Sequence, residues 1–93
     1  MTKLNSLLHQ ELRLSIISFL IGVEWADFNK LIEITSASKG NLIVQISNLQ
    51  KAGYLKVKKS FKGNYPHTEC CITKLGRSEF EIYLENIKKM LHI

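Results

Sequence analysis

Apolar residues recur at steps of three and four near the start of the chain, which is the period of an amphipathic helix. The sequence therefore predicts a helix over Leu4–Ile21, ended by Gly22. The next four residues, Val23–Ala26, predict one brief strand. Asp27 is suited to cap a short second helix that runs to about Thr35.

A polar turn separates this helix from a third one, predicted over Lys39–Ala52 with Ser38 as its N-cap. At 100° per residue, one narrow arc of the third helix is apolar, and Gly53 follows as the residue that ends it. That apolar arc consists of Leu42, Ile46 and Leu49. The opposite arc is polar except at Val44. Two helices joined by so short a turn are typical of a helix-turn-helix.

Apolar and polar residues alternate from Tyr54 to Lys62, which predicts a half-buried strand. Residues 63–67, GNYPH, predict a turn, and Thr68–Ile72 predicts the returning strand. Thr73 then caps a long last helix. Its apolar stripe consists of Phe80, Tyr83, Leu84, Ile87 and Leu91. Together these elements predict an α+β winged helix-turn-helix with long N- and C-terminal helices.

The composition is that of a globular protein, because 45% of the 93 residues are hydrophobic and 23% are charged. One domain over residues 1–93 is expected at this length. No apolar run reaches the roughly 18 residues of a membrane span, and the polar start predicts no signal peptide. The two cysteines, Cys70 and Cys71, are adjacent and predict no disulfide framework. A cytoplasmic protein without a membrane partner is expected.

The net charge of +5 is concentrated in the middle of the chain. Residues 1–36 hold three Lys or Arg against four acids, and residues 75–93 hold three of each. Residues 37–74 hold seven lysines and one acid, Glu69. Such an asymmetry indicates a face for nucleic acid or for an anionic membrane.

The side chains that support enzymatic or metal chemistry are scattered. His9, His67 and His92 lie far apart in the sequence, and no Gly-rich phosphate loop or acid pair accompanies them. Adjacent residues of a strand point to opposite faces, so Cys70 and Cys71 make a poor metal chelate. Neither enzymatic activity nor a metal or cofactor is expected, and metal or redox sensing is a minor alternative.

The segment GNLIVQISNLQKAGYL, followed by the hairpin and by TKLGR, resembles small winged-helix transcriptional regulators related to the MarR-like and ArsR-like groups. The resemblance extends over about residues 5–91 and rests on three short motifs. These are a Gly-Asn-Leu start of the recognition helix, its Leu-x-x-x-Gly-Tyr end, and a Gly-Arg start of the last helix. The resemblance implies a dimeric regulator that binds double-stranded DNA, with both long terminal helices at the dimer interface. It identifies no effector.

In such regulators the third helix enters the major groove and the hairpin lies on the DNA backbone as a wing. Lys39 opposes the helix dipole in the first turn, but it suits a phosphate bound to the free N–H groups there. Gly40 lowers helix propensity but lets a backbone approach closely. The candidate DNA-binding residues are Ser38, Lys39, Gly40, Asn41, Val44, Gln45, Ser47, Asn48, Lys58, Lys59, Lys62 and His67.

Asn41 and Gln45 are expected nearest the base edges, where Asn and Gln suit adenine through paired bonds. Val44 suits a thymine methyl, but a protein contact or a merely exposed valine explains it equally well. An A·T-rich half-site, repeated as an inverted pair about 10 base pairs apart, is expected. Asn41 can alternatively bond within its own helical turn.

The first and last helices have more apolar positions than one core of this size needs, which predicts a homodimer. The residues assigned to that interface are Leu4, Leu7, Leu8, Tyr83, Ile87, Met90 and Leu91. The alternative function is a winged-helix module that binds another protein and no DNA. Salt distinguishes the two, because DNA binding weakens steeply with ionic strength and an apolar contact does not.

Overall fold

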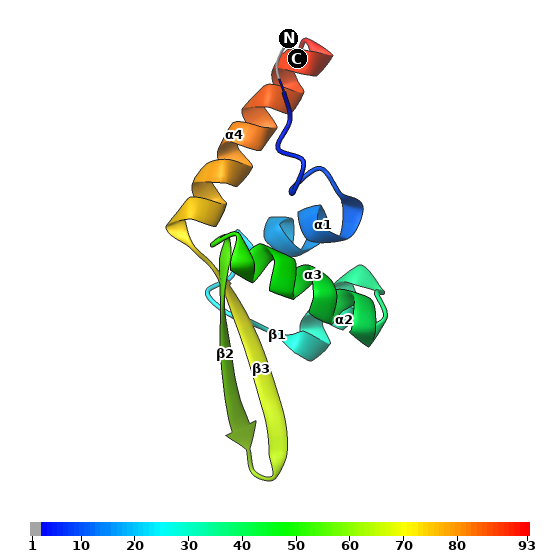
Figure 1. Cartoon of the computed structure of the whole chain (residues 1–93), viewed down its shortest axis with the longest axis vertical. Helices are drawn as coiled ribbons and strands as arrows, with labels where there is room; N and C mark the ends of the chain where they lie inside the picture. Colours follow the sequence, from blue (N-terminus) through cyan, green and yellow to red (C-terminus); the bar gives the residue numbers. More distant parts are fainter. Residues whose placement is uncertain (1–2) are drawn as a thin grey trace.

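The computed structural model describes residues 3–93, and over this part of the chain four α-helices and one three-stranded sheet form a winged helix (Figure 1). The elements in chain order are α1 (Glu11–Leu20), β1 (Ala26–Asp27), α2 (Phe28–Thr35), α3 (Lys39–Lys51), β2 (Leu55–Lys62), β3 (Tyr65–Ile72) and α4 (Lys74–Leu91). The α+β class and the order of the elements confirm the sequence prediction. Within residues 3–93, no helix is both long and apolar enough to cross a bilayer.

The molecule is elongated, with principal dimensions of 52 × 25 × 21 Å. Helices α1, α2 and α3 lie together, and the β2–β3 hairpin extends from them as the wing (Figure 1). Helix α4 starts at the base of the hairpin and extends in the opposite direction. The strand order is β1-β3-β2, and both neighbouring pairs are antiparallel. The wing therefore reaches well beyond the three helices.

Three helices begin where the sequence predicts, because the residue before each supplies a side-chain oxygen to a free backbone N–H. Asp27 accepts from the N–H of Lys30 at 2.7 Å and starts α2. Ser38 and Thr73 accept in the same way from the N–H three residues on, at 3.2 and 3.0 Å. They start α3 and α4.

The prediction of a first helix from Leu4 is wrong in its N-terminal part, because α1 begins only at Glu11. Gln10 has an extended backbone, with φ −149° and ψ 131°, and interrupts the helical run. Its side chain accepts from the N–H of Arg13 at 2.8 Å and caps α1. The apolar spacing continues across this break, so periodicity alone overestimates the helix.

Asn5 caps a single turn of the chain before the break, in which the N–H of His9 donates to the Asn5 carbonyl at 2.9 Å. Its side-chain oxygen accepts from the N–H groups of Leu7 and Leu8, at 2.9 and 3.2 Å. These bonds satisfy the first N–H groups of that one turn, and Gln10, with its extended backbone, ends it. The Asn5 amide nitrogen donates to the Tyr54 hydroxyl at 2.8 Å and to Glu79 at 3.3 Å. The N-terminal segment is thereby fixed to the end of α3 and to α4.

Strand β1 comprises Ala26–Asp27 and not the predicted Val23–Ala26. Ala26 pairs with Cys70, and Asp27 pairs with Glu69. Cys70 is fully buried, and Ala26 beside it is buried as well. Pairing with β3 in this register places the strand directly before α2, nearer to that helix than the predicted range.

The turn of the hairpin is shorter than the five residues predicted at 63–67. Lys62 pairs with Tyr65, so only Gly63 and Asn64 connect the strands. Gly63 has a φ of +63°, and a positive φ at the first of two turn residues is typical of a type II′ turn. The three residues after this turn therefore belong to β3.

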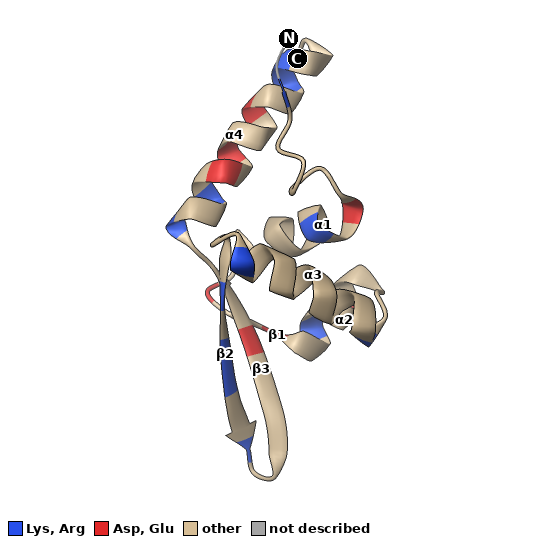
Figure 2. Ribbon diagram, viewed as in Figure 1, with Lys and Arg blue, Asp and Glu red and all other residues tan. Residues whose placement is uncertain are grey.

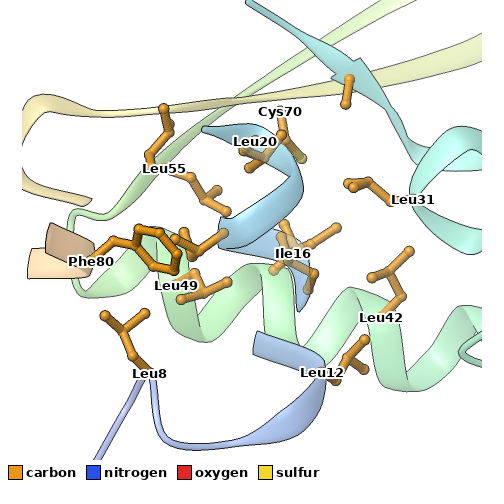
Figure 3. Packing of buried hydrophobic residues seen from close by; sticks show 14 of the residues in the cluster. Leu8, Leu12, Ile16, Leu20, Leu31, Leu42, Leu49, Leu55, Cys70 and Phe80 are labelled. Carbon is orange, nitrogen blue, oxygen red and sulfur yellow. The ribbon is translucent and has the colours of Figure 1, made fainter. Parts of the chain in front are cut away.

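The hydrophobic core lies between α1, α2, α3, the base of the hairpin and α4 (Figure 3). Its largest fully buried side chains are Leu8, Ile16, Ile17, Leu20, Leu31, Leu42, Leu49 and Cys70. Leu42, Leu49 and also Ile46 form the buried side of α3, which confirms the predicted register of that helix. The burial of Cys70 and Ile72 shows that their face of β3 is turned towards the core.

A close contact joins the first turn of α4 to the base of the wing. The N–H of Thr73 donates to the carbonyl of Tyr54 at 3.0 Å, and its hydroxyl donates to the carbonyl of Gly53 at 2.6 Å. A Cβ on Gly76 would lie 2.1 Å from the carbonyl oxygen of Tyr54 and 2.9 Å from its carbonyl carbon. There is consequently no room for a side chain at Gly76.

We expect Gly76→Ala to lower the free energy of unfolding by about 1–3 kcal/mol, because backbone atoms of Tyr54 would have to move. The matched control is Gly40→Ala in α3, where nothing lies within 4 Å of the added Cβ. This control should gain up to about 1 kcal/mol, since Ala favours helix over Gly. Urea unfolding gives the free energy of unfolding of both variants. Equal stabilities would contradict the close contact.

Candidate nucleic-acid interface

The side of α3 that faces away from the core is exposed and has no acidic residue. Gly40, Asn41 and Val44 are exposed there, Val44 with 53% of its surface. Ser47 and Asn48 are half-buried on the same side. The structure thus brings most of the predicted recognition residues onto one accessible surface.

The N-terminal end of α3 borders this exposed surface. Ser38 and Lys39 are both exposed, and the Ser38 hydroxyl already accepts from the N–H of Asn41. The first N–H groups of a helix have no partner within it, and the helix dipole favours an anion beside them. Lys39 adds a positive charge at the same end. The arrangement suits a phosphate group.

Asn41, Gln45 and Asn48 form one hydrogen-bonded group with Arg13 of α1. The Arg13 Nη1 donates to Gln45 Oε1 at 2.6 Å. Gln45 Nε2 donates to Asn41 Oδ1 at 3.1 Å, and Asn48 Nδ2 donates to Gln45 Oε1 at 3.4 Å. Gln45 is half-buried, so Asn41 is the more accessible of the two predicted reading residues. Arg13 was not predicted, because it lies 32 positions from Gln45 on another helix.

The wing lysines lie on two faces of the hairpin, which the sequence prediction did not separate. Lys59 follows Val57 in the strand alternation and lines a groove beside α3 together with it. Lys58 and Lys62 alternate with these residues and face the other way. Only one of the three predicted lysines therefore lies on the α3 side.

Lys58 already has partners within the chain. Its Nζ lies 3.7 Å from Glu69 Oε1 and 4.9 Å from the centre of the Trp25 ring. His67 Nε2 lies 3.5 Å from the same oxygen of Glu69. These contacts keep the single acid of the wing on the face away from α3. They also engage two side chains that were predicted to bind DNA.

The groove between α3 and the wing has a volume of about 410 Å³. Its lining consists of Phe28, Ile43, Ile46, Ser47, Gln50, Val57, Lys59 and Thr68. Ile43, at its edge, is 58% exposed. The only charged residue of this lining is Lys59, so the groove extends the positive side of the wing towards α3.

The tip of the wing exposes two aromatic rings that were not predicted as site residues. Phe61 is 73% exposed and pairs across the hairpin with Pro66. Tyr65 is 77% exposed and pairs with Lys62. Figure 2 shows positive residues along β2 as far as this tip, against one acidic residue on β3. The tip therefore combines positive charge with aromatic surface.

The residues predicted for the dimer interface divide into three groups. Leu8 and Tyr83 are buried in this chain's own core, so their assignment to a partner surface is wrong for this conformation. The Tyr83 hydroxyl also bonds His9 Nδ1 at 2.8 Å. Met90 and Leu91 are exposed. The other predicted residues, Leu4, Leu7 and Ile87, are partly buried against the core.

The two cysteines have different surroundings. Burial, and to a smaller extent the charge of the neighbouring Cys71 thiol, raise the pKa of the Cys70 thiol to about 11. Cys70 is therefore protonated and unreactive at neutral pH. The Cys71 thiol donates to the carbonyl of Ile72 at 3.3 Å. Among residues 3–93, no group of three or more His, Cys, Asp or Glu side chains is placed to hold a metal ion.

Comparison with known proteins supports the geometric interpretation. A family model described as a winged helix DNA-binding domain matches residues 12–91. An uncharacterized protein of Methanocaldococcus jannaschii is 32% identical over 78 residues, which cover 84% of this chain and 85% of that protein.

Two solved structures with the same fold differ in how similar they are to this chain in structure and in sequence. A transcriptional regulator homologue from Pyrococcus horikoshii OT3 has a TM-score of 0.87 and 27% identity, covering 95% of this chain and 87% of that chain. Bacillus subtilis PadR, solved in complex with operator DNA, has a TM-score of 0.71 and 13% identity, covering 81% of this chain and 48% of that chain. The second similarity is one of fold alone.

Proposed function

The chain belongs to the family of winged helix DNA-binding domains, and we propose that it is a transcriptional regulator that binds specific sites in double-stranded DNA. One observation carries the proposal. The exposed side of α3 and the Lys59 side of the wing border one groove, and neither of these two surfaces has an acidic residue. The occurrence of this fold with operator DNA in PadR supports the same conclusion.

Helix α3 enters the major groove through its first two turns, as recognition helices do. The major groove of DNA is about 12 Å wide and admits a helix. Asn41 then faces the base edges, and Val44 packs against a thymine methyl. Lys39 and the free N–H groups of the first turn of α3 bind the phosphate at the border of the major groove.

The wing follows the DNA backbone beside the major groove, and Lys59 contacts a phosphate. Such contacts add affinity and fix the position of the protein without reading the sequence. Lys58 and His67 remain with Glu69 on the outer face of the hairpin. Lys62 lies on the Lys58 face next to the turn, so it adds positive charge at the tip and is not placed on this phosphate.

The second candidate function is a protein-interaction module, and it is favoured by the exposed apolar side chains of Ile43 and Val44. In that case a partner protein covers the groove between α3 and the wing. Its binding depends on apolar burial and changes little with salt. The positive charge of the wing then serves solubility.

The direct test selects bound sequences from a random duplex pool and measures the affinity of the selected site at several salt concentrations. We expect an enriched A·T-rich site with two inverted half-sites about 10 base pairs apart. Affinity should fall steeply with salt, because phosphate contacts release counterions. Recovery of random sequences, with salt-independent binding to a protein partner, would favour the interaction module.

We expect Lys59→Ala to weaken binding to selected and random duplexes by similar factors. The slope of log affinity against log salt should flatten by about 0.9, which is the value for one lost phosphate contact. Lys58→Ala is the matched control, since this neighbour lies on the other face beside Glu69. Fluorescence anisotropy measures both variants, and equal losses for the two lysines would contradict the assignment of the α3-side face to DNA.

The distal half of α4 supports a homodimer, which we include in the proposal. This part of the helix extends away from α1–α3 (Figure 1). The apolar stripe that starts at the buried Phe80 continues along it through Leu84 and Leu91, which are 41% and 58% exposed. A second copy related by a two-fold axis covers this stripe on both chains. The same axis places two recognition helices on an inverted site.

A dimer through this stripe predicts that Leu84→Glu and Leu91→Glu each give monomers at tens of micromolar, whereas the unchanged chain sediments as a dimer. The control is Ile82→Glu on the same helix, because Ile82 is 50% exposed but lies on another side of it. This variant should remain dimeric. Sedimentation of the unchanged protein as a monomer would refute the dimer.

A further inference from the structure

The contact between Arg13 and Gln45 fixes the orientation of a side-chain amide beside the recognition surface. Arg13 Nη1 lies 2.6 Å from Gln45 Oε1, and Arg13 Nε donates to the carbonyl of Leu7 at 2.6 Å. The guanidinium is thus held from two sides. An arginine can only donate hydrogen bonds, so the Gln45 atom that faces it must be the oxygen.

The orientation of Gln45 then determines that of Asn41. Asn48 Nδ2 supplies a second donor to Gln45 Oε1, at 3.4 Å. The Gln45 NH2 group is consequently turned to Asn41, and it donates to Asn41 Oδ1 at 3.1 Å. This bond keeps the Asn41 oxygen on the Gln45 side. The Asn41 NH2 group is left without a partner in the hydrogen bonds of residues 3–93.

We propose that Arg13 is a positioning residue for base recognition, which acts through Gln45 to turn the NH2 group of Asn41 towards the DNA. A free asparagine side chain presents its oxygen or its nitrogen with little preference. The relay from Arg13 selects the nitrogen before DNA binds, so less conformational freedom is lost on binding. The proposal rests on the proposed function, because it requires α3 to lie in the major groove.

The base edge that suits an outward NH2 group is one with an acceptor. Purine N7 is an acceptor in the major groove for both adenine and guanine. A purine therefore satisfies the Asn41 NH2 group through N7, whereas cytosine presents only the N4 donor at this edge and is disfavoured. Arg13 itself touches no base in this scheme. Its removal should relax the choice of base at one position without weakening contacts to phosphates.

The experiment compares the unchanged protein with Asn41→Ala, Arg13→Lys and Gln45→Met. Asn41→Ala first identifies the half-site position whose base preference it abolishes. The unchanged protein should favour a purine there by at least about fivefold over a cytosine. Arg13→Lys keeps the positive charge but cannot hold Leu7 and Gln45 in the same fork. Gln45→Met keeps Arg13 in place and breaks the relay one step later.

Both relay variants should reduce the preference at the Asn41 position to within about twofold. Arg13→Lys, which keeps the charge at a residue that touches no base, should leave random-duplex affinity unchanged. A purine that lacks N7, 7-deazapurine, should weaken the unchanged protein at that position and have little effect on either variant. In an Asn41→Ala background, Arg13→Lys should produce no further change, because residues that act as a unit are not additive.

Three results would overturn the proposal, and each differs from failure of the proposed function. Retention of the full preference for a purine over a cytosine in both relay variants would show that Arg13 does not orient Asn41. Equal loss on selected and random duplexes would make Arg13 a phosphate contact. A change at a different half-site position in Gln45→Met would make Gln45 a separate reader. If the unchanged protein enriches no sequence, the proposed function itself fails. Thermal unfolding of each variant confirms that it is folded.

Discussion

The rest of the structure depends on one backbone junction, where the end of α3, the base of the wing and the start of α4 meet. Gly53, with a φ of +83°, ends α3 in a Schellman motif, in which the N–H of Tyr54 donates to the carbonyl of Leu49. The Tyr54 carbonyl then accepts from the N–H of Thr73 and lies against Gly76. A helix end, a sheet and a helix start are thereby fixed within a few ångströms.

This junction explains why the two halves of the proposed DNA surface keep a constant relation. The hairpin leaves α3 directly at Gly53, so the direction of the wing follows from the end of the recognition helix. Strand alternation then decides which lysines face α3, and it places Lys59 there and Lys58 opposite. The acid of the wing, Glu69, is held by Lys58 and His67 on the outer face. An acid-free surface follows from register, and not from composition alone.

The sequence predicted those parts of the fold that depend on local signals. Three caps and the buried arc of α3 are confirmed, because each is set by residues within one or two helical turns. The hairpin turn was overestimated, since a two-residue turn depends on the pairing of Lys62 with Tyr65. Strand alternation separates Lys58 from Lys59, but which of the two faces lies beside α3 depends on contacts across the fold. The burial of Leu8 and Tyr83 was missed for the same reason.

The break before α1 is the most informative of these differences. An unbroken helix from Leu4 would satisfy the same apolar spacing, but it would keep the Leu7 carbonyl within its own hydrogen bonds. With the break at Gln10, that carbonyl is free to accept from Arg13 Nε. The guanidinium can then hold Gln45 on α3, while Asn5 reaches Tyr54 at the junction. One interruption of periodicity therefore links the N-terminal segment both to the junction and to the recognition surface.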